Sequence, residues 1–213
     1  MKKIFAFSFL LLFVSISVKA QSELRLGVKG GVNFASVGGD FTNNTRGVFG
    51  YHLGGLVEVP IVTKLTFQPE VLFSAQGSEH NTMATDGPRI ITNLNYVNLP
   101  LMAKYYLIDN FSVMGGPQLG YLVSAKNEIT SSGFIGSSTT QENDLKDEIS
   151  NFDFGLGIGA EYRLDLGVFV QLRYVIGVSN VNEKEGVVLG YHRTSNDVKS
   201  TNNVLQISAG YSF

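Results

Sequence analysis

Few residues in this chain could carry out acid–base or covalent chemistry. It contains three histidines and no cysteine. His52 lies in an alternating apolar segment, whereas His80 and His192 lie in polar segments with Ser78, Asp86, Ser195 and Asp197. No G-x-S-x-G or H-E-x-x-H motif is present, so neither a nucleophile elbow nor a zinc site is indicated. We expect solvated loop histidines, no cofactor, no metal ion and no enzymatic activity, with a lipid-modifying enzyme of the outer leaflet as the third hypothesis.

A second set of candidate residues is charged and alternates with apolar neighbours. Its members are Arg25, Lys29, Glu58, Lys64, Glu70, Lys104, Asp153, Glu161, Arg163 and Arg173. Two functions fit such a set. The charges could line a narrow channel for ions or small solutes, or they could pair with one another and fill the interior. We favour the filled interior, because a buried charge without a partner is costly.

Two polar segments are rich in acidic residues. Segment 125–151 carries Glu128, Glu142, Asp144, Asp147 and Glu148 against Lys126 and Lys146. Segment 178–202 has a similar mixture of charges. Carboxylates in a loop could bind a divalent cation, but the D-x-D-x-D-G calcium pattern is absent. These segments are therefore expected to be hydrated or to contact a protein partner.

The elements that position these residues alternate with a period of two. Apolar and polar residues alternate over 24–34, 49–59, 64–75, 96–107, 111–124, 152–163, 168–177 and 203–213, as in strands with one apolar face. The 24 glycines and 15 phenylalanines also disfavour helix. Beyond residue 20 no run approaches 18 apolar residues, so helical membrane spans are excluded.

The connections between these strands alternate in length. Segments 35–48, 76–95, 125–151 and 178–202 are long and polar, whereas 60–63, 108–110 and 164–167 are short. Long loops at one end distinguish an outer-membrane barrel from a soluble sandwich. The sequence predicts an all-β fold, an eight-stranded antiparallel up-and-down transmembrane β-barrel with short periplasmic turns and long extracellular loops. Eight strands leave room only for side chains in the lumen.

Prolines and aromatic residues refine this prediction. Pro69, Pro100 and Pro117 lie inside predicted strands, although proline cannot donate to a strand ladder. We expect a bulge or a local break at each proline. Aromatic residues gather near the strand ends, which is typical of the two interfacial girdles of a membrane barrel.

The N-terminal segment predicts export. Lys2 and Lys3 precede an apolar run that ends near Val18, and Val18-Lys19-Ala20 has the small residues of a cleavage site. We predict a signal peptide over 1–20, cleaved after Ala20, and a barrel domain over 21–213 in the cell outer membrane. Loss of three lysines takes the formal net charge from −2 to −5. No basic face then remains for nucleic acid.

Several segments resemble one known family. GVKGGVNF at 27–34, LTFQPEVLFSAQGS at 65–78, YVNLPLMAKYYL at 96–107, MGGPQLGYLVSAK at 114–126, NFDFGLGIGAEY at 151–162 and the terminal YSF are similar to the outer-membrane β-barrel domain family of Bacteroidota. Its members are called porin family proteins and sometimes PorT-like. The resemblance implies that Tyr211 and Phe213 form a signal for the barrel assembly machinery, and PorT-like relatives imply an association with protein secretion.

Taken together, these features predict an integral outer-membrane protein with a structural or interaction role. Its expected partners are outer-membrane lipids, the assembly machinery during biogenesis, and a protein that contacts the surface loops or the periplasmic rim.

Overall fold

The computed structural model describes residues 24–39, 45–81, 89–132, 138–144, 146, 150–179 and 200–213. The strands are β1 (Arg25–Gly39), β2 (Thr45–Val62), β3 (Leu65–Asn81), β4 (Arg89–Ile108), β5 (Phe111–Ser132), β6 (Ser138–Asp144), β7 (Phe152–Arg163), β8 (Val168–Gly177) and β9 (Ser200–Ser212). No helix in these ranges is long and apolar enough to cross a membrane. The predicted signal peptide, residues 1–20, lies outside the described residues and stays a prediction.

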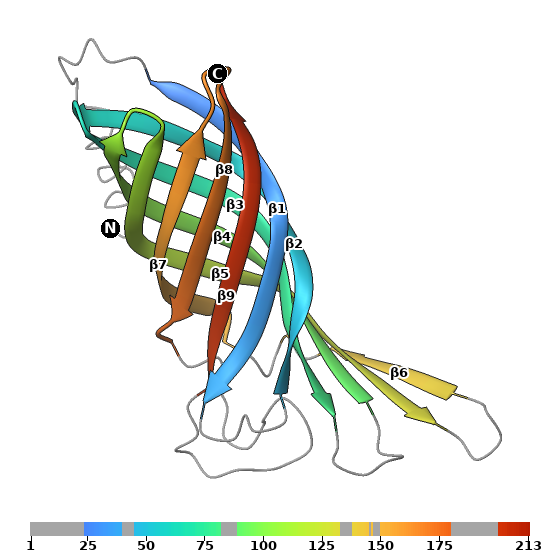
Figure 1. Ribbon diagram of the computed structural model, residues 1–213. Coiled ribbons are helices and arrows are strands. Elements are labelled where there is room, and N and C mark those ends of the chain that lie inside the picture. The colour runs from blue at the N-terminus through green and yellow to red at the C-terminus, as the bar shows by residue number, and fades with distance from the viewer. Residues whose placement is uncertain are drawn as a thin grey trace.

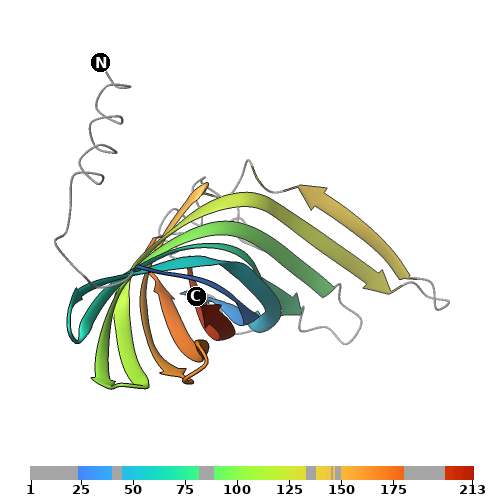
Figure 2. The same ribbon diagram turned by 90° about the horizontal axis from the view of Figure 1, so that it is seen from above.

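Eight of these strands close into a barrel. Every pair is antiparallel, and sequential barrel strands are neighbours, with β5 followed by β7. Pairing of β1 with β9 closes the cylinder, which Figure 1 shows from the side and Figure 2 from above. The predicted eight-stranded up-and-down barrel is confirmed. The tight turns after β2, β4 and β7 and the C-terminus lie at one end, which we call the short-turn end.

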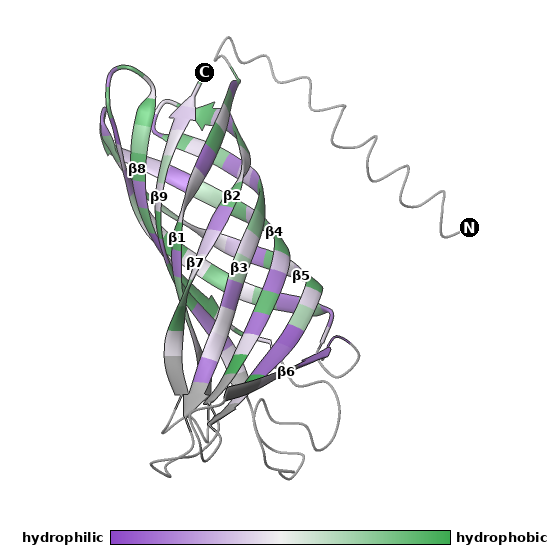
Figure 3. Cartoon of the chain, turned by 90° about the vertical axis from the view of Figure 1, so that its right-hand side faces the viewer, coloured by the Kyte–Doolittle hydropathy of each residue, from purple (hydrophilic) through white to green (hydrophobic). Residues whose placement is uncertain are grey.

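The alternation of the sequence separates an outer face from an inner face. On β8 the exposed and buried residues alternate at every position from Val168 to Gly177. The outward residues are apolar and exposed, such as Leu26 at 60% and Ile207 at 55%, and bands of opposite hydropathy alternate along the strands in Figure 3. An apolar outer surface on a closed barrel is what lipid requires.

Aromatic pairs lie on the outer face near both ends. At the long-loop end Phe34 contacts Phe49 with ring centroids 5.1 Å apart, and Tyr121 contacts Phe152 at 5.4 Å. At the short-turn end Tyr211 and Phe213 lie edge to face at 5.0 Å. These positions match the expected aromatic girdles at the two membrane interfaces, where the polar hydroxyl of a tyrosine can reach the headgroup level.

The strands are longer than predicted, and the predicted loops are shorter. Residues 35–39, 76–81, 89–95 and 125–132 continue β1, β3, β4 and β5, and β6 is a strand within the expected loop 125–151. The expectation of loops throughout these segments was wrong. The outward-facing residues of these extensions, such as Asn93, Asn95 and Lys126, are polar, because this face lies outside the membrane and need not be apolar. An apolar alternation with period two therefore does not reveal the extensions.

Each proline lies in a local break of one ladder. The β2–β3 pairing skips the positions opposite Pro69, the β3–β4 pairing skips those opposite Pro100, and the β4–β5 pairing skips those opposite Pro117. Pairing continues on the other side of each proline, at Pro69 with Leu101 and at Pro117 with Leu156. Since the register is unchanged across these gaps, the predicted breaks are present without bulges.

We predict that Gly31→Ala prevents or strongly destabilises barrel formation. An added Cβ at Gly31 would lie 2.0 Å from the Ile207 carbonyl oxygen, so β1 and β9 would have to separate where the barrel closes. The expected loss is at least about 1–3 kcal/mol, the usual cost of overpacking. Heat-modifiable gel migration and urea unfolding in lipid vesicles measure it. Gly115→Ala is the control, because its nearest contact is 3.6 Å away; equal stability of both variants contradicts the prediction.

Candidate functional site

Inward-facing charges meet in the half of the lumen nearer the short-turn end. Lys104 from β4 donates to Glu58 at 2.7 Å and also contacts Glu161. Arg163 donates from its Nη1 to Glu58 at 2.9 Å and from its Nη2 to Glu161 at 3.0 Å. Two carboxylates and two cations from β2, β4 and β7 thus neutralise one another.

A second group lies deeper in the lumen. Glu70 accepts two hydrogen bonds from the Arg173 guanidinium, at 3.0 Å on Oε2 and 2.5 Å on Oε1, and the Lys29 ammonium lies 2.7 Å from the same Oε2. All three side chains are fully buried. A bidentate arginine with a second cation holds this carboxylate ionised in a fixed geometry.

Two glutamines join the groups. Gln68 donates to Glu70 at 2.7 Å and accepts from Lys104 at 3.4 Å. Gln171 accepts from Lys29 at 2.8 Å and donates to Glu161 at 3.2 Å. We call the connected set the lumen charge network; its ionic members are Lys29, Glu58, Glu70, Lys104, Glu161, Arg163 and Arg173.

Three residues of the predicted charged set lie outside this network. Arg25 is exposed at the start of β1, and Lys64 is exposed in the turn between β2 and β3. Asp153 lies at the opposite end, where Ser179 donates a hydrogen bond to it at 2.5 Å. The structure does not bring these three residues to the central charges, because residues at the strand ends lie at other levels of the lumen even where their position in the alternation faces inward.

A neutral polar layer follows the network. His52 contacts the Asn33 side-chain oxygen at 2.8 Å through Nδ1 and the Ser208 hydroxyl at 2.7 Å through Nε2. This Ser-His-Asn order resembles a nucleophile with its base, but all three side chains are at most 3% exposed. A substrate carbonyl has no access to Ser208, so the trio serves as a packed hydrogen-bond chain.

Most of the other catalytic candidates fall outside the part of the chain that the structure describes. Ser78 is buried, and Asp86, His192, Ser195 and Asp197 lie outside the described residues, as does the side chain of His80. Within the described ranges no group of three His, Asp or Glu residues could hold a metal ion.

Apolar side chains fill the lumen near the long-loop end. Leu94, Tyr96, Leu122 and Ala125 form one buried cluster, and Ala35, Val175 and Val204 form another. These clusters were not predicted from the sequence, although Leu94 and Leu122 occupy positions of the alternation that face inward, and this signal could have revealed them. Because apolar constrictions repel water, these clusters oppose conduction.

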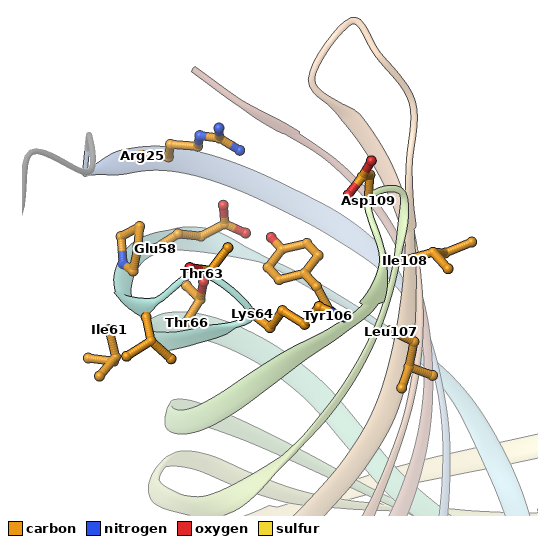
Figure 4. A pocket seen from close by; sticks show the side chains of 12 residues that line it. Arg25, Glu58, Ile61, Thr63, Lys64, Thr66, Tyr106, Leu107, Ile108 and Asp109 are labelled. Atoms are coloured by element: carbon orange, nitrogen blue, oxygen red, sulfur yellow. The ribbon is translucent and has the colours of Figure 1, made fainter.

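The short-turn end opens into a pocket of about 510 Å³ (Figure 4). The side chains of Arg25, Glu58 and Tyr106 point toward it from three strands, with Lys64 and Asp109 at its edge. Its floor is the lumen charge network, since Glu58 is held by Lys104 and Arg163. This pocket is therefore a shallow mouth above a packed interior.

Beyond the barrel, β5 and β6 form a projecting hairpin (Figure 1). Lys126 and Glu142 pair across it at 2.5 Å, both about half exposed. The hydrogen bond from this ammonium to the Glu142 carboxylate raises the pKa of Lys126 above its ordinary value. Here the sheet ends in a strand that pairs on one side only among the described residues.

Comparison with known proteins identifies the family. The outer membrane protein beta-barrel domain family matches residues 19–183. The chain belongs to this family. Its members' location and the closed lipid-facing barrel place the protein in the outer membrane. A comparison with curated proteins gives no match.

Several solved structures of outer-membrane proteins match this chain at low identity and with TM-scores under 0.5. Ail, the attachment invasion locus protein of Yersinia pestis, is 15% identical and the match covers 90% of this chain and 100% of Ail, with a TM-score of 0.49. Neisserial surface protein A is 13% identical over 88% of this chain and 97% of its own, with a TM-score of 0.47. OprG of Pseudomonas aeruginosa is 12% identical over 89% and 95%, with a TM-score of 0.42.

We predict that Glu70→Gln lowers the free energy of unfolding by about 3–5 kcal/mol, because Lys29 and Arg173 would remain buried without their carboxylate. Urea titration of the barrel in lipid vesicles measures the change. Glu142→Gln is the matched control, since it breaks an exposed pair and should leave stability unchanged. Similar unfolding curves for E70Q and the wild type would contradict the role of the network.

Proposed function

We propose that this protein is a non-conducting outer-membrane barrel whose extracellular sheet binds a protein partner. The observation that carries the proposal is the open edge of β6. β5 pairs with β7 from Phe111 to Tyr121 and then with β6 from Lys126 to Ser132. The sheet thus continues past the barrel, and among the described residues β6 has no pairing partner on its outer side.

An edge strand of this kind suits recognition by strand addition. Its unpaired N–H and C=O groups can hydrogen-bond an extended segment of another protein, and side chains then select the partner. Thr140, Glu142, Asn143 and Asp144 on β6 are all exposed. The acidic pair among them favours a partner segment that carries lysine or arginine.

The filled lumen supports the non-conducting part of the proposal. The charge network closes one half and the cluster of Leu94, Tyr96 and Leu122 fills the other. A narrow channel would need both to open. Burial of Ser208 and His52 likewise favours a protein without catalytic activity.

The proposal also includes the family subgroup, the cleavage site and the C-terminal assembly signal that the sequence predicts. The family resemblance supports a Bacteroidota, PorT-like protein whose partner belongs to a secretion or envelope assembly. Cleavage after Ala20 and recognition of Tyr211 and Phe213 by the assembly machinery would bring the barrel to the membrane.

We predict that a photo-crosslinking amino acid at Asn143 yields a discrete protein adduct in intact cells, because a strand added to β6 would lie against this residue. The control position is Val178, which is exposed at the end of β8, outside the β5–β6 hairpin; it should yield no such adduct. Gel electrophoresis of the irradiated cells detects the adduct.

The refolded wild-type protein should show no single-channel conductance in a planar bilayer. Steady single-channel openings would overturn the non-conducting barrel, and equal crosslinking from Asn143 and Val178 would overturn the role of the β6 edge.

A further inference from the structure

The lipid-facing wall contains a groove near the short-turn end. Its volume is about 550 Å³ and it crosses β1, β2, β3 and β4. Leu26, Val28, Val57, Val71, Leu99 and Phe213 provide its outward-facing sides. These side chains face the membrane, so the groove opens into hydrocarbon.

A glycine and the proline gaps create the groove. Val28, Gly55 and Val71 are direct partners across β1, β2 and β3, so Gly55 leaves a depression between two larger side chains. The skipped pairings next to Pro69 lie beside it and let the groove reach Leu56 and Glu70. Glu70 is held by Lys29 and Arg173, which leaves an essentially apolar surface for an occupant.

The C-terminal residue forms one wall. The Phe213 N–H donates to the Leu26 carbonyl at 2.7 Å, and its ring packs against Tyr211. This fixes an aromatic side chain at the rim, where the interfacial girdle meets the acyl chains.

We propose that the groove binds one acyl chain of a phospholipid from the periplasmic leaflet. The surrounding solvent is lipid, the lining is apolar, and the groove lies on the short-turn side, which the sequence places in the periplasm. An acyl chain in the groove covers apolar side chains that would otherwise border an irregular gap, and each methylene that it buries adds to the affinity.

Charge at the rim defines the headgroup. Arg25 directly precedes Leu26, and Lys64 lies in the β2–β3 turn at the same end. Both are exposed and neither forms an ion pair with another described residue. Both side chains line the mouth of the lumen at this end (Figure 4), so a headgroup that lies over the rim would meet two cations, which favours an anionic phospholipid such as phosphatidylglycerol.

The test compares two glycines on the outer face. A Cβ at Gly55 would meet only the Gly27 carbonyl at 3.7 Å, and one at Gly115 only the Gly157 carbonyl at 3.6 Å. Gly55→Leu therefore fills the groove without a backbone clash, and Gly115→Leu adds the same side chain elsewhere. Both variants and the wild type are reconstituted in vesicles of phosphatidylglycerol and phosphatidylcholine, and native mass spectrometry then counts the phospholipids that stay bound.

We expect the wild type and Gly115→Leu to retain one phosphatidylglycerol that Gly55→Leu loses. Arg25→Ala should retain a lipid but lose the preference for phosphatidylglycerol. Heat-modifiable migration establishes that each barrel is folded, and Gly55→Val replaces Gly55→Leu if the leucine variant does not fold. Identical lipid counts for all proteins overturn the site. A dimer that dissociates in Gly55→Leu also overturns it, since a second copy would then be the occupant.

Discussion

The bilayer interior offers no water to a backbone N–H or C=O group, and this constraint governs the whole molecule. Every strand that crosses it must pair on both sides. The contact of β1 with β9 therefore determines whether the barrel exists, and it runs from Gly27 with Ser212 to Gly39 with Ser200. The prolines obey the same constraint. Each lies where one ladder is skipped while the other side stays paired, so the wall tolerates three residues without an N–H donor.

Closure with eight strands creates a narrow lumen and thereby decides what the interior can do. Charged side chains that face inward have no solvent, so they must satisfy one another. Glu70 accepts from Arg173 and Lys29. Gln68 connects Glu70 through Lys104 to Glu58, and Gln171 connects Lys29 to Glu161. Packed polar layers and apolar clusters then occupy the bore. In the proposed function this interior stabilises the barrel, and recognition belongs to the projecting sheet.

The sequence was informative where lipid imposes a pattern and uninformative elsewhere. Alternation predicted the eight barrel strands and the inward parity of Lys29, Glu70 and Arg173, because one face of each strand had to be apolar. It could not predict that Glu70 meets Arg173, since the two are 103 residues apart and their levels depend on strand register. The strand β6 was missed because a strand in water needs no apolar face. Likewise, the groove depends on Gly55 lying between Val28 and Val71, which only the paired structure reveals.

The position of β6 also follows from the pairing of β5. Because β7 begins at Phe152, opposite Tyr121, the C-terminal part of β5 would present an open edge, and β6 covers it from Lys126 to Ser132. This moves the open edge outward by one strand and places exposed Glu142 and Asp144 along it. Charged residues on an edge discourage indiscriminate strand pairing. A strand with basic side chains can still pair with this edge, because its charges attract Glu142 and Asp144, whereas an acidic strand is repelled. An edge that is open yet charged therefore suits selective recognition. The fold can have such an edge only outside the membrane, because inside it every backbone N–H and C=O group must be paired.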